Sequence, residues 1–155
     1  LDLTQEATPE WSNIDSSHVV QGLLSGYLMD STLEWSPVYS STLSASTVHS
    51  NDVLWATVML ETMNSLEDVS IVAVVEEDGE VVHWGNAELN RFIGDSSQDH
   101  QIAYHTLLLN NIACGPSAQV KFFVWNKGKK TFKISEFWIN VKQGNRLVYG
   151  LTDEF

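Results

Sequence analysis

The chain has 155 residues, of which 43% are hydrophobic, and these values fit one globular domain better than a disordered segment. Its formal net charge of −12 argues against a nucleic-acid ligand, because phosphate contacts need lysine and arginine. No apolar run approaches the roughly 20 residues of a membrane-spanning helix. We therefore expect residues 1–155 to form a single domain that neither binds nucleic acid nor inserts into a membrane. The chain begins with Leu1 and shows no leader pattern, which favours a domain excised from a larger protein.

Basic residues are concentrated near the end of the chain. Residues 1–120 hold one basic residue, Arg91, against 17 acidic ones, whereas residues 121–155 hold seven basic residues against three acidic ones. We expect most of these lysines to lie in solvated turns and on edge strands, where lysine prevents edge-to-edge aggregation. A basic patch that binds a partner is the alternative.

Turn residues separate short apolar runs along most of the chain, and this pattern is typical of an all-β domain. The expected strands, in chain order, are residues 18–29, 37–47, 53–60, 69–76, 81–84, 102–109, 119–125, 131–142 and 147–151. Three turns predict hairpins between consecutive strands, EDGE at 77–80, NKGK at 126–129 and QGNR at 143–146. Only residues 87–93 fit a turn or two of helix. Eight or nine short antiparallel strands predict a β-sandwich or a barrel.

The alternation of side chains in residues 119–126 predicts which aromatic rings face the core. One face is wholly apolar and consists of Val120, Phe122 and Val124. The other face is mixed and carries Lys121, Phe123 and Trp125. We therefore expect the rings of Phe123 and Trp125 to point away from the core.

Two other strands also turn a tryptophan outward. In residues 131–142 the apolar alternation changes phase near Ser135-Glu136, which predicts a β-bulge and directs Glu136 and Trp138 away from the core. In residues 53–60, Trp55 falls on the more mixed face. Exposed tryptophans of this kind indicate a ligand, a covering loop or a neighbouring domain.

Five segments, in this order, resemble the jelly-roll domains of the carbohydrate-binding-module and galactose-binding-like type. They are SSHVVQGLLSGYLMD, DVLWATVMLETM, VSIVAVVEEDGEVVHWG, DHQIAYHTLLLN and AQVKFFVWNKGKKTFKISEFWINV. The similarity covers about residues 10–142 and is greatest to domains of large surface proteins of Bacteroidetes-like bacteria. In those domains a strand of the form lkvyvWN meets a Gk turn and then a strand ending in iDDfsI, which correspond here to residues 120–126, 128–129 and 134–139.

The resemblance implies an all-β, two-sheet antiparallel β-sandwich with jelly-roll topology and an extracellular or cell-surface location. It also bears on calcium, because an aspartate before the last core strand helps to hold a structural calcium ion in related modules. The paired aspartates of the family are Ser135-Glu136 here, so only Glu136, with Glu6, could contribute. Calcium takes about six to eight oxygen ligands, and the absence of any cofactor is the alternative.

Carbohydrate recognition needs flat aromatic rings for sugar C–H surfaces and polar groups for the hydroxyls. The candidate binding residues are Trp55, Trp84, Tyr104, Lys121, Phe123 and Trp125, with His83 and Asn126 as polar companions. Asn126 also fits the first position of a turn. The first hypothesis is therefore a non-catalytic domain that binds a polysaccharide or another glycan.

The second hypothesis is a structural spacer or protein-interaction domain, whose exposed rings pack on neighbouring domains of a parent protein. Each aromatic ring taken alone fits ordinary packing. The two hypotheses differ in whether Trp55, Trp84 and Trp125 line one open groove or lie beneath loops.

An enzyme is not expected. The acidic pairs fall in or beside turns, and no pair is marked as the two carboxyl groups that a glycosidase holds about 5–10 Å apart. The five histidines show no HExxH motif, and no glycine-rich phosphate loop or nucleophile elbow is present. The single cysteine, Cys114, excludes an internal disulfide and fits a buried, unreactive thiol.

Overall fold

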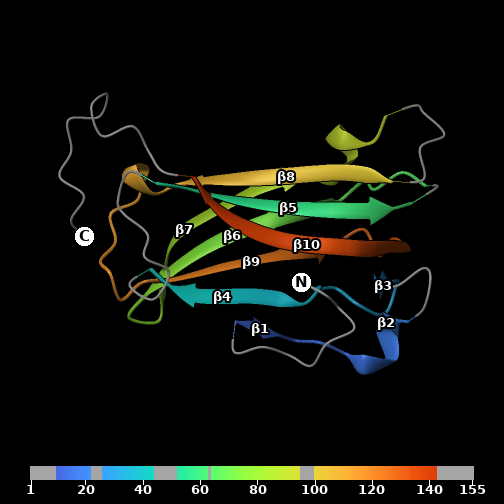
Figure 1. The fold of residues 1–155 in the computed structure, drawn as a ribbon, viewed down its shortest axis with the longest axis horizontal. Helices are drawn as coiled ribbons and strands as arrows, with labels where there is room; N and C mark the ends of the chain where they lie inside the picture. Colours follow the sequence, from blue (N-terminus) through green and yellow to red (C-terminus); the bar gives the residue numbers. More distant parts are fainter. Residues whose placement is uncertain (1–9, 22–25, 44–51, 63, 95–99, 143–155) are drawn as a thin grey trace.

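In a computed structural model of the chain, the described residues form ten strands in two five-stranded antiparallel sheets that pack face to face (Figure 1). The structure describes residues 10–21, 26–43, 52–62, 64–94 and 100–142. The strands are β1 (Trp11–Ser12), β2 (Val19–Val20), β3 (Gly26–Met29), β4 (Val38–Thr42), β5 (Val53–Glu61), β6 (Val69–Glu77), β7 (Glu80–Glu88), β8 (Gln101–Leu108), β9 (Gln119–Asn126) and β10 (Phe132–Lys142). Three short 3-10 helices are η1 (Ser16–His18), η2 (Leu89–Phe92) and η3 (Leu109–Asn111). Within these ranges, no helix has the length and apolar character needed to cross a bilayer.

The connections between strands follow a jelly roll. The first sheet, sheet A, has the order β1-β4-β9-β6-β7, and the second, sheet B, has the order β2-β3-β10-β5-β8. From β3 onward every connection crosses to the other sheet except the one between β6 and β7. This winding of eight strands is that of a jelly roll. The expected all-β antiparallel sandwich is confirmed.

The core lies between the two sheets and is built mainly by the inward-facing side chains of β3, β5, β6, β8, β9 and β10. In β9, Val120, Phe122 and Val124 are buried in this core, as the alternation predicted. Tyr27, Phe132 and Phe137 contribute further rings from sheet B. Burial of each large apolar side chain stabilises the fold by about 1.5–3 kcal/mol.

Two local predictions are confirmed by the strand pairing. The β6–β7 hairpin turns at Asp78 and Gly79, whose φ angles of 52° and 84° match the positive values that a type I′ turn requires. In β10 the register with β5 shifts between Ile134 and Glu136, which is the expected bulge. The expected helical turn in residues 87–93 is the 3-10 helix η2.

The predicted hairpin at residues 126–129 is wrong. Strand β9 pairs with β4 and β6 in sheet A, whereas β10 pairs with β3 and β5 in sheet B, so the turn is a corner between sheets. The buried side chain of Asn126 stabilises this corner through the carbonyl groups of three other residues. A turn of the same composition serves either connection, because its residues fix the reversal of the chain and not the sheet that the next strand joins.

Other elements are shorter than predicted. Residues 18–29 form two short strands, β2 and β3, with residues 22–25 outside the described part of the chain, and β4 ends at Thr42. The hairpin expected at residues 143–146 and the strand at 147–151 also lie outside the described residues.

Lys127, Lys129 and Lys130 lie in the turn between β9 and β10, as expected, but the expected edge-strand position is wrong for the lysines of these two strands. Each of these strands is the centre of its sheet. Lys121 Nζ lies 2.6 Å from Glu76 of β6, and Lys133 Nζ lies 2.7 Å from Glu61 of β5. Each of these two strands thus has one earlier neighbour that carries its acidic partner, β6 for β9 and β5 for β10, and opposite charges meet across the sheets.

Candidate functional site

Four aromatic rings gather on the outer face of sheet A. We call Trp35, Trp84, Phe123 and Trp125 the aromatic cluster. The rings of Trp35 and Trp125 are stacked, with centroids 5.4 Å apart and an interplanar angle of 11°. Trp35 meets Phe123 edge-on at 5.4 Å, and Trp84 meets Phe123 and Trp125 edge-on at 6.2 Å and 6.1 Å. Offset stacking and edge-on packing are the favoured geometries for such rings.

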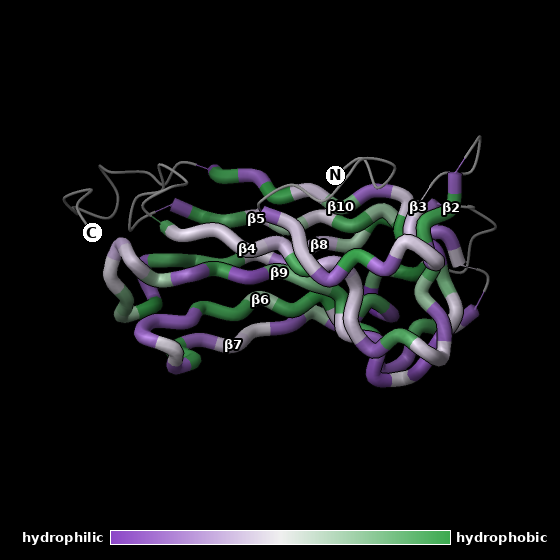
Figure 2. Tube along the Cα trace, turned by 90° about the horizontal axis from the view of Figure 1, so that it is seen from below, coloured by the Kyte–Doolittle hydropathy of each residue, from purple (hydrophilic) through white to green (hydrophobic). Residues whose placement is uncertain are grey.

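Strand register positions three of these rings. Phe123 and Trp125 of β9 point outward, as the sequence predicted, and stand opposite Val72 and Ser70 of β6. Trp84 of β7 stands opposite Val74 of β6, one strand further along the sheet. Val72 and Val74 are almost completely buried beneath the rings, although they face away from the core between the sheets. The middle of strand β6, Ile71–Val75, is therefore apolar on both faces, and hydrophobic colour covers this part of the strand (Figure 2).

The fourth ring comes from the connection between β3 and β4, where Trp35 forms an isolated bridge with Trp125. Backbone hydrogen bonds hold this connection along β9, from Asn126 N to Glu34 O (2.8 Å) and from Ser36 N to Val124 O (3.0 Å). Trp125 Nε1 also donates to Glu34 Oε1 at 3.1 Å. These bonds fix the Trp35 ring against its partner even though the ring is 39% exposed.

A groove of about 500 Å³ runs across this face. It is lined by Ser12, Asn13, Trp35, Val38, Ser40, Val74, Glu76, Val81, Trp84, Lys121 and Phe123. The central strands supply the buried side chains Val74 and Phe123, while Trp84 is 48% exposed on the edge strand β7. The ion pair of Lys121 and Glu76 is partly exposed in the lining. Flat rings and polar groups are therefore available together to a molecule in the groove.

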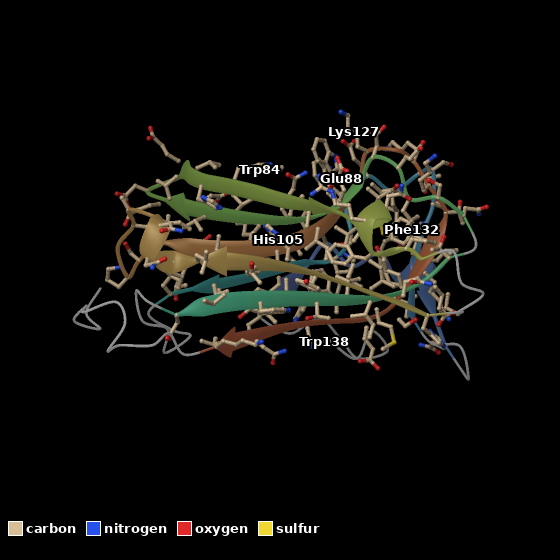
Figure 3. All side chains as sticks on the ribbon, turned by 90° about the horizontal axis from the view of Figure 1, so that it is seen from above. Trp84, Glu88, His105, Lys127, Phe132 and Trp138 are labelled. Carbon is tan, nitrogen blue, oxygen red and sulfur yellow. The ribbon has the colours of Figure 1, made fainter. Side chains whose placement is uncertain are left out.

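The structure divides the six predicted binding residues between opposite faces of the sandwich. Trp84, Lys121, Phe123 and Trp125 belong to sheet A and lie around the groove or in the aromatic cluster. Trp55 and Tyr104 belong to sheet B, where their rings stack at 5.1 Å. Figure 3 labels Trp84 on the outer side of sheet A and Trp138 on the outer side of sheet B. Trp55, Trp84 and Trp125 therefore do not line one groove.

The outer face of sheet B has its own aromatic group. Phe92 of η2 meets Tyr104 edge-on at 5.1 Å, and Lys142 Nζ lies 3.7 Å from the centroid of the Trp55 ring. Tyr104 is 45% exposed. This face is a second surface, separate from the groove.

The two polar companions expected beside the rings lie elsewhere. His83 precedes Trp84 and points to the inner side of β7, where its Nε2 lies near Gly85 and His105. Asn126 is fully buried at the corner between sheets, which agrees with its alternative role in a turn.

Sequence reasoning did not select Trp35, Ser12 or Asn13. Trp35 lies in a connection with no strand alternation, so no periodicity indicated which way its ring points. Its one available signal was a tryptophan followed by Ser36-Pro37, which marks the end of a loop before a strand. Trp11 was also not selected, and it packs in the core against Phe137 at 5.2 Å.

The calcium ligand expected from the resemblance, Glu136, is exposed on the outer face of sheet B and stands opposite Met59. Glu6 lies outside the described residues. Within the described ranges, no three His, Cys, Asp or Glu side chains gather closely enough to hold a metal ion together. Calcium binding stays a prediction.

Comparisons of the chain with protein families, with curated proteins and with solved structures found no match. Fold and site together define the class of the protein, an antiparallel jelly-roll sandwich with an aromatic groove on one outer sheet face. No family or homologue identifies it further.

Proposed function

We propose that the domain binds carbohydrate without catalysis, through the groove on the outer face of sheet A. The observation that carries this proposal is the position of two partly exposed tryptophans, Trp35 and Trp84, in the lining of one open groove. Indole rings in such positions offer apolar faces to the C–H surfaces of a sugar ring. Lys121, Glu76 and Asn13 offer donors and acceptors to its hydroxyl groups.

The groove chemistry supports binding over hydrolysis. Glycosidases use two carboxyl groups about 5–10 Å apart, and Glu76 is the one carboxylate among the residues that line the groove. Glu76 is paired with Lys121 at 2.6 Å.

Outside the groove, burial, and then the charge of Glu77, raise the pKa of the Cys114 thiol, so this side chain is a poor nucleophile.

The resemblance to carbohydrate-binding modules agrees with this proposal and extends it to an extracellular or cell-surface domain of a larger protein. Its ligand would be a polysaccharide or another glycan. The high negative charge favours a neutral glycan over a polyanionic one, because a sulfated or carboxylated chain would be repelled.

The second candidate function is that of a spacer that packs on a neighbouring domain. A specific observation favours it, namely the exposed apolar side chains on and around the outer face of sheet B. Ile102, Tyr104 and Leu108 are each more than two-fifths exposed. A protein neighbour would cover such a surface.

The two candidates are separated by matched variants on opposite faces. Trp84 and Tyr104 have nearly equal exposed fractions, 48% and 45%, so their replacement by alanine should cost similar stability. The isolated domain is titrated with a panel of neutral plant, algal and microbial polysaccharides, and tryptophan fluorescence and calorimetry report binding. We expect Trp84→Ala to weaken binding about tenfold, since a stacked ring contributes about 1 kcal/mol or more.

Tyr104→Ala should bind as the unchanged domain does. An equal loss of polysaccharide affinity in both variants, or a loss of affinity in Tyr104→Ala alone, would show that the groove is not the binding site. An absence of binding across the panel would favour the spacer.

A further inference from the structure

Two histidines face each other across the open side of the sandwich. His83 lies on β7, the edge strand of sheet A, and His105 lies on β8, the edge strand of sheet B. Strands β7 and β8 contact each other, so the two edges meet on the same side of the molecule. Figure 3 looks onto this side and labels His105 between the sheets.

Register explains why both rings point inward. His83 stands opposite Val75 of β6, and His105 stands opposite Ala56 of β5. Val75 and Ala56 are both fully buried members of the core. Opposite residues share a face of a sheet, so both imidazoles extend toward the space between the sheets.

Gly85 provides the space in which the rings converge. A Cβ atom at this position would lie 3.1 Å from His83 Nε2 and 3.2 Å from His105 Nε2. Both nitrogens therefore approach the same point, and a larger residue there would crowd both. Because Gly85 has no side chain, residue 85 does not fill the space beside the two imidazoles.

The His105 ring also has an unused ligand atom. Among the described residues, its Nε2 is the buried side-chain nitrogen or oxygen that has no hydrogen-bond partner. An unpaired buried polar atom normally costs stability, so this nitrogen is available to a partner. Burial, and then the nearby His83, lower the pKa of His105.

We propose that His83 and His105 bind one divalent transition-metal ion of the class that prefers imidazole, Zn²⁺, Ni²⁺ or Cu²⁺, between the edges of the two sheets. Neutral imidazole nitrogen suits these ions. Zinc–nitrogen bonds measure about 2.0–2.1 Å, and rotation about the broad χ2 torsion of histidine lets the two nitrogens, which both lie close to Gly85, turn toward one ion. Water fills the remaining coordination positions. The site is separate from the groove and does not depend on carbohydrate binding.

The test uses zinc alone, added to the whole chain after treatment with a chelator and its removal. Calorimetry should give one bound ion per chain, and His83→Gln and His105→Gln should each weaken binding by about tenfold or more, since each removes half of the protein ligands. Gly85→Ala keeps both imidazoles but fills the space between them, and should weaken binding as well. His100→Gln is the matched control, because His100 is exposed and pairs with Glu61 instead.

Thermal unfolding provides the second readout. Zinc at about 100 times its dissociation constant should raise the Tm by roughly 5 °C in the unchanged chain and in His100→Gln. The rise should be absent in the double variant His83→Gln/His105→Gln, whose folding is checked first by circular dichroism. Equal zinc binding in the double variant and the unchanged chain would overturn the proposal. So would an absence of zinc binding in the unchanged chain, in which case the histidines only guard the sheet edges with inward-facing polar groups.

Discussion

Asn126 is fully buried where the chain leaves sheet A for sheet B. Its Nδ2 donates to the carbonyl oxygens of Asp30 (3.0 Å), Leu33 (3.1 Å) and Lys130 (2.9 Å), and its Oδ1 accepts from Lys130 N at 2.8 Å. One amide thus joins the β9–β10 corner to the connection that carries Trp35. No other side chain type supplies two donor hydrogens and an acceptor within this volume.

Asn126→Ala should lower the free energy of unfolding by about 2–4 kcal/mol, because it leaves buried carbonyl groups unpaired and empties the corner. Urea denaturation of the two proteins measures the difference. Asn140→Ala is the control, since Asn140 is exposed on β10, and it should change stability by less than about 0.5 kcal/mol. An equal, small effect of both substitutions would show that the corner does not depend on the Asn126 amide.

Among single residues, sequence reasoning placed Lys121, Phe123 and Trp125 correctly on an outward face, because strand alternation reports the face directly. It did not place Trp35, whose position depends on hydrogen bonds between segments about 90 residues apart in sequence. The groove on sheet A therefore has one wall that periodicity predicts and one that it does not.

At the scale of elements, the pairing of β5 with β10 joins the acidic and basic parts of the chain. Lys133 and Glu61 stand directly opposite each other, and Ser135 Oγ donates to Glu61 Oε1 at 2.7 Å beside the bulge. Burial alone would raise the pKa of Glu61. Hydrogen bonds from Lys133 and Ser135, with the charges of Lys133 and His100, outweigh burial and hold the pKa below its usual value of 4.5.

The depressed pKa of Glu61 gives a stability contribution that is complete above about pH 5 and declines as the pH falls through the lower pKa of the folded state. Glu61→Gln should therefore lose less stability than the unchanged domain between about pH 5 and pH 3. Denaturant midpoints measured across this interval test the difference.

Glu88→Gln provides the comparison at an exposed ion pair, because Glu88 and Arg91 are both largely solvent-exposed. This variant should retain the acid sensitivity of the unchanged domain. If the denaturant midpoints of Glu61→Gln and the unchanged domain depended on pH in the same way, the ion pair of Glu61 and Lys133 would not contribute to folding stability.

At the scale of the whole molecule, charge pairing between strands leaves a large excess of negative charge. Lys121 and Lys133 are neutralised by Glu76 and Glu61, yet the net charge of the chain remains −12. Self-repulsion of this excess opposes the compact state.

Raising the ionic strength from about 10 mM to 300 mM at pH 7 should therefore raise the Tm, because it shortens the Debye length from about 30 Å to roughly 6 Å. Calorimetric scans in sodium chloride measure the shift. A Tm that falls with salt would indicate that attraction within the ion pairs exceeds the repulsion of the excess charge.

The β9–β10 connection shows which part of the topology the turn residues did not predict. The turn residues predicted a reversal of direction, and a reversal occurs, but the second strand joins the other sheet. The jelly-roll order itself was expected from the resemblance to known domains and not from turn chemistry.

The sequence by itself determined the all-β class, the inward and outward faces of β9, the hairpin turn at Asp78-Gly79 and the bulge in β10. Each of these depends on interactions within about ten residues, so local spacing and backbone preference are sufficient. Tertiary structure alone decided that Trp35 joins Trp84 and Trp125, that Trp55 lies on the opposite sheet, and that His83 meets His105. Strand alternation separates inside from outside but does not say to which of two sheets a strand belongs, and that choice is made by pairing between distant segments.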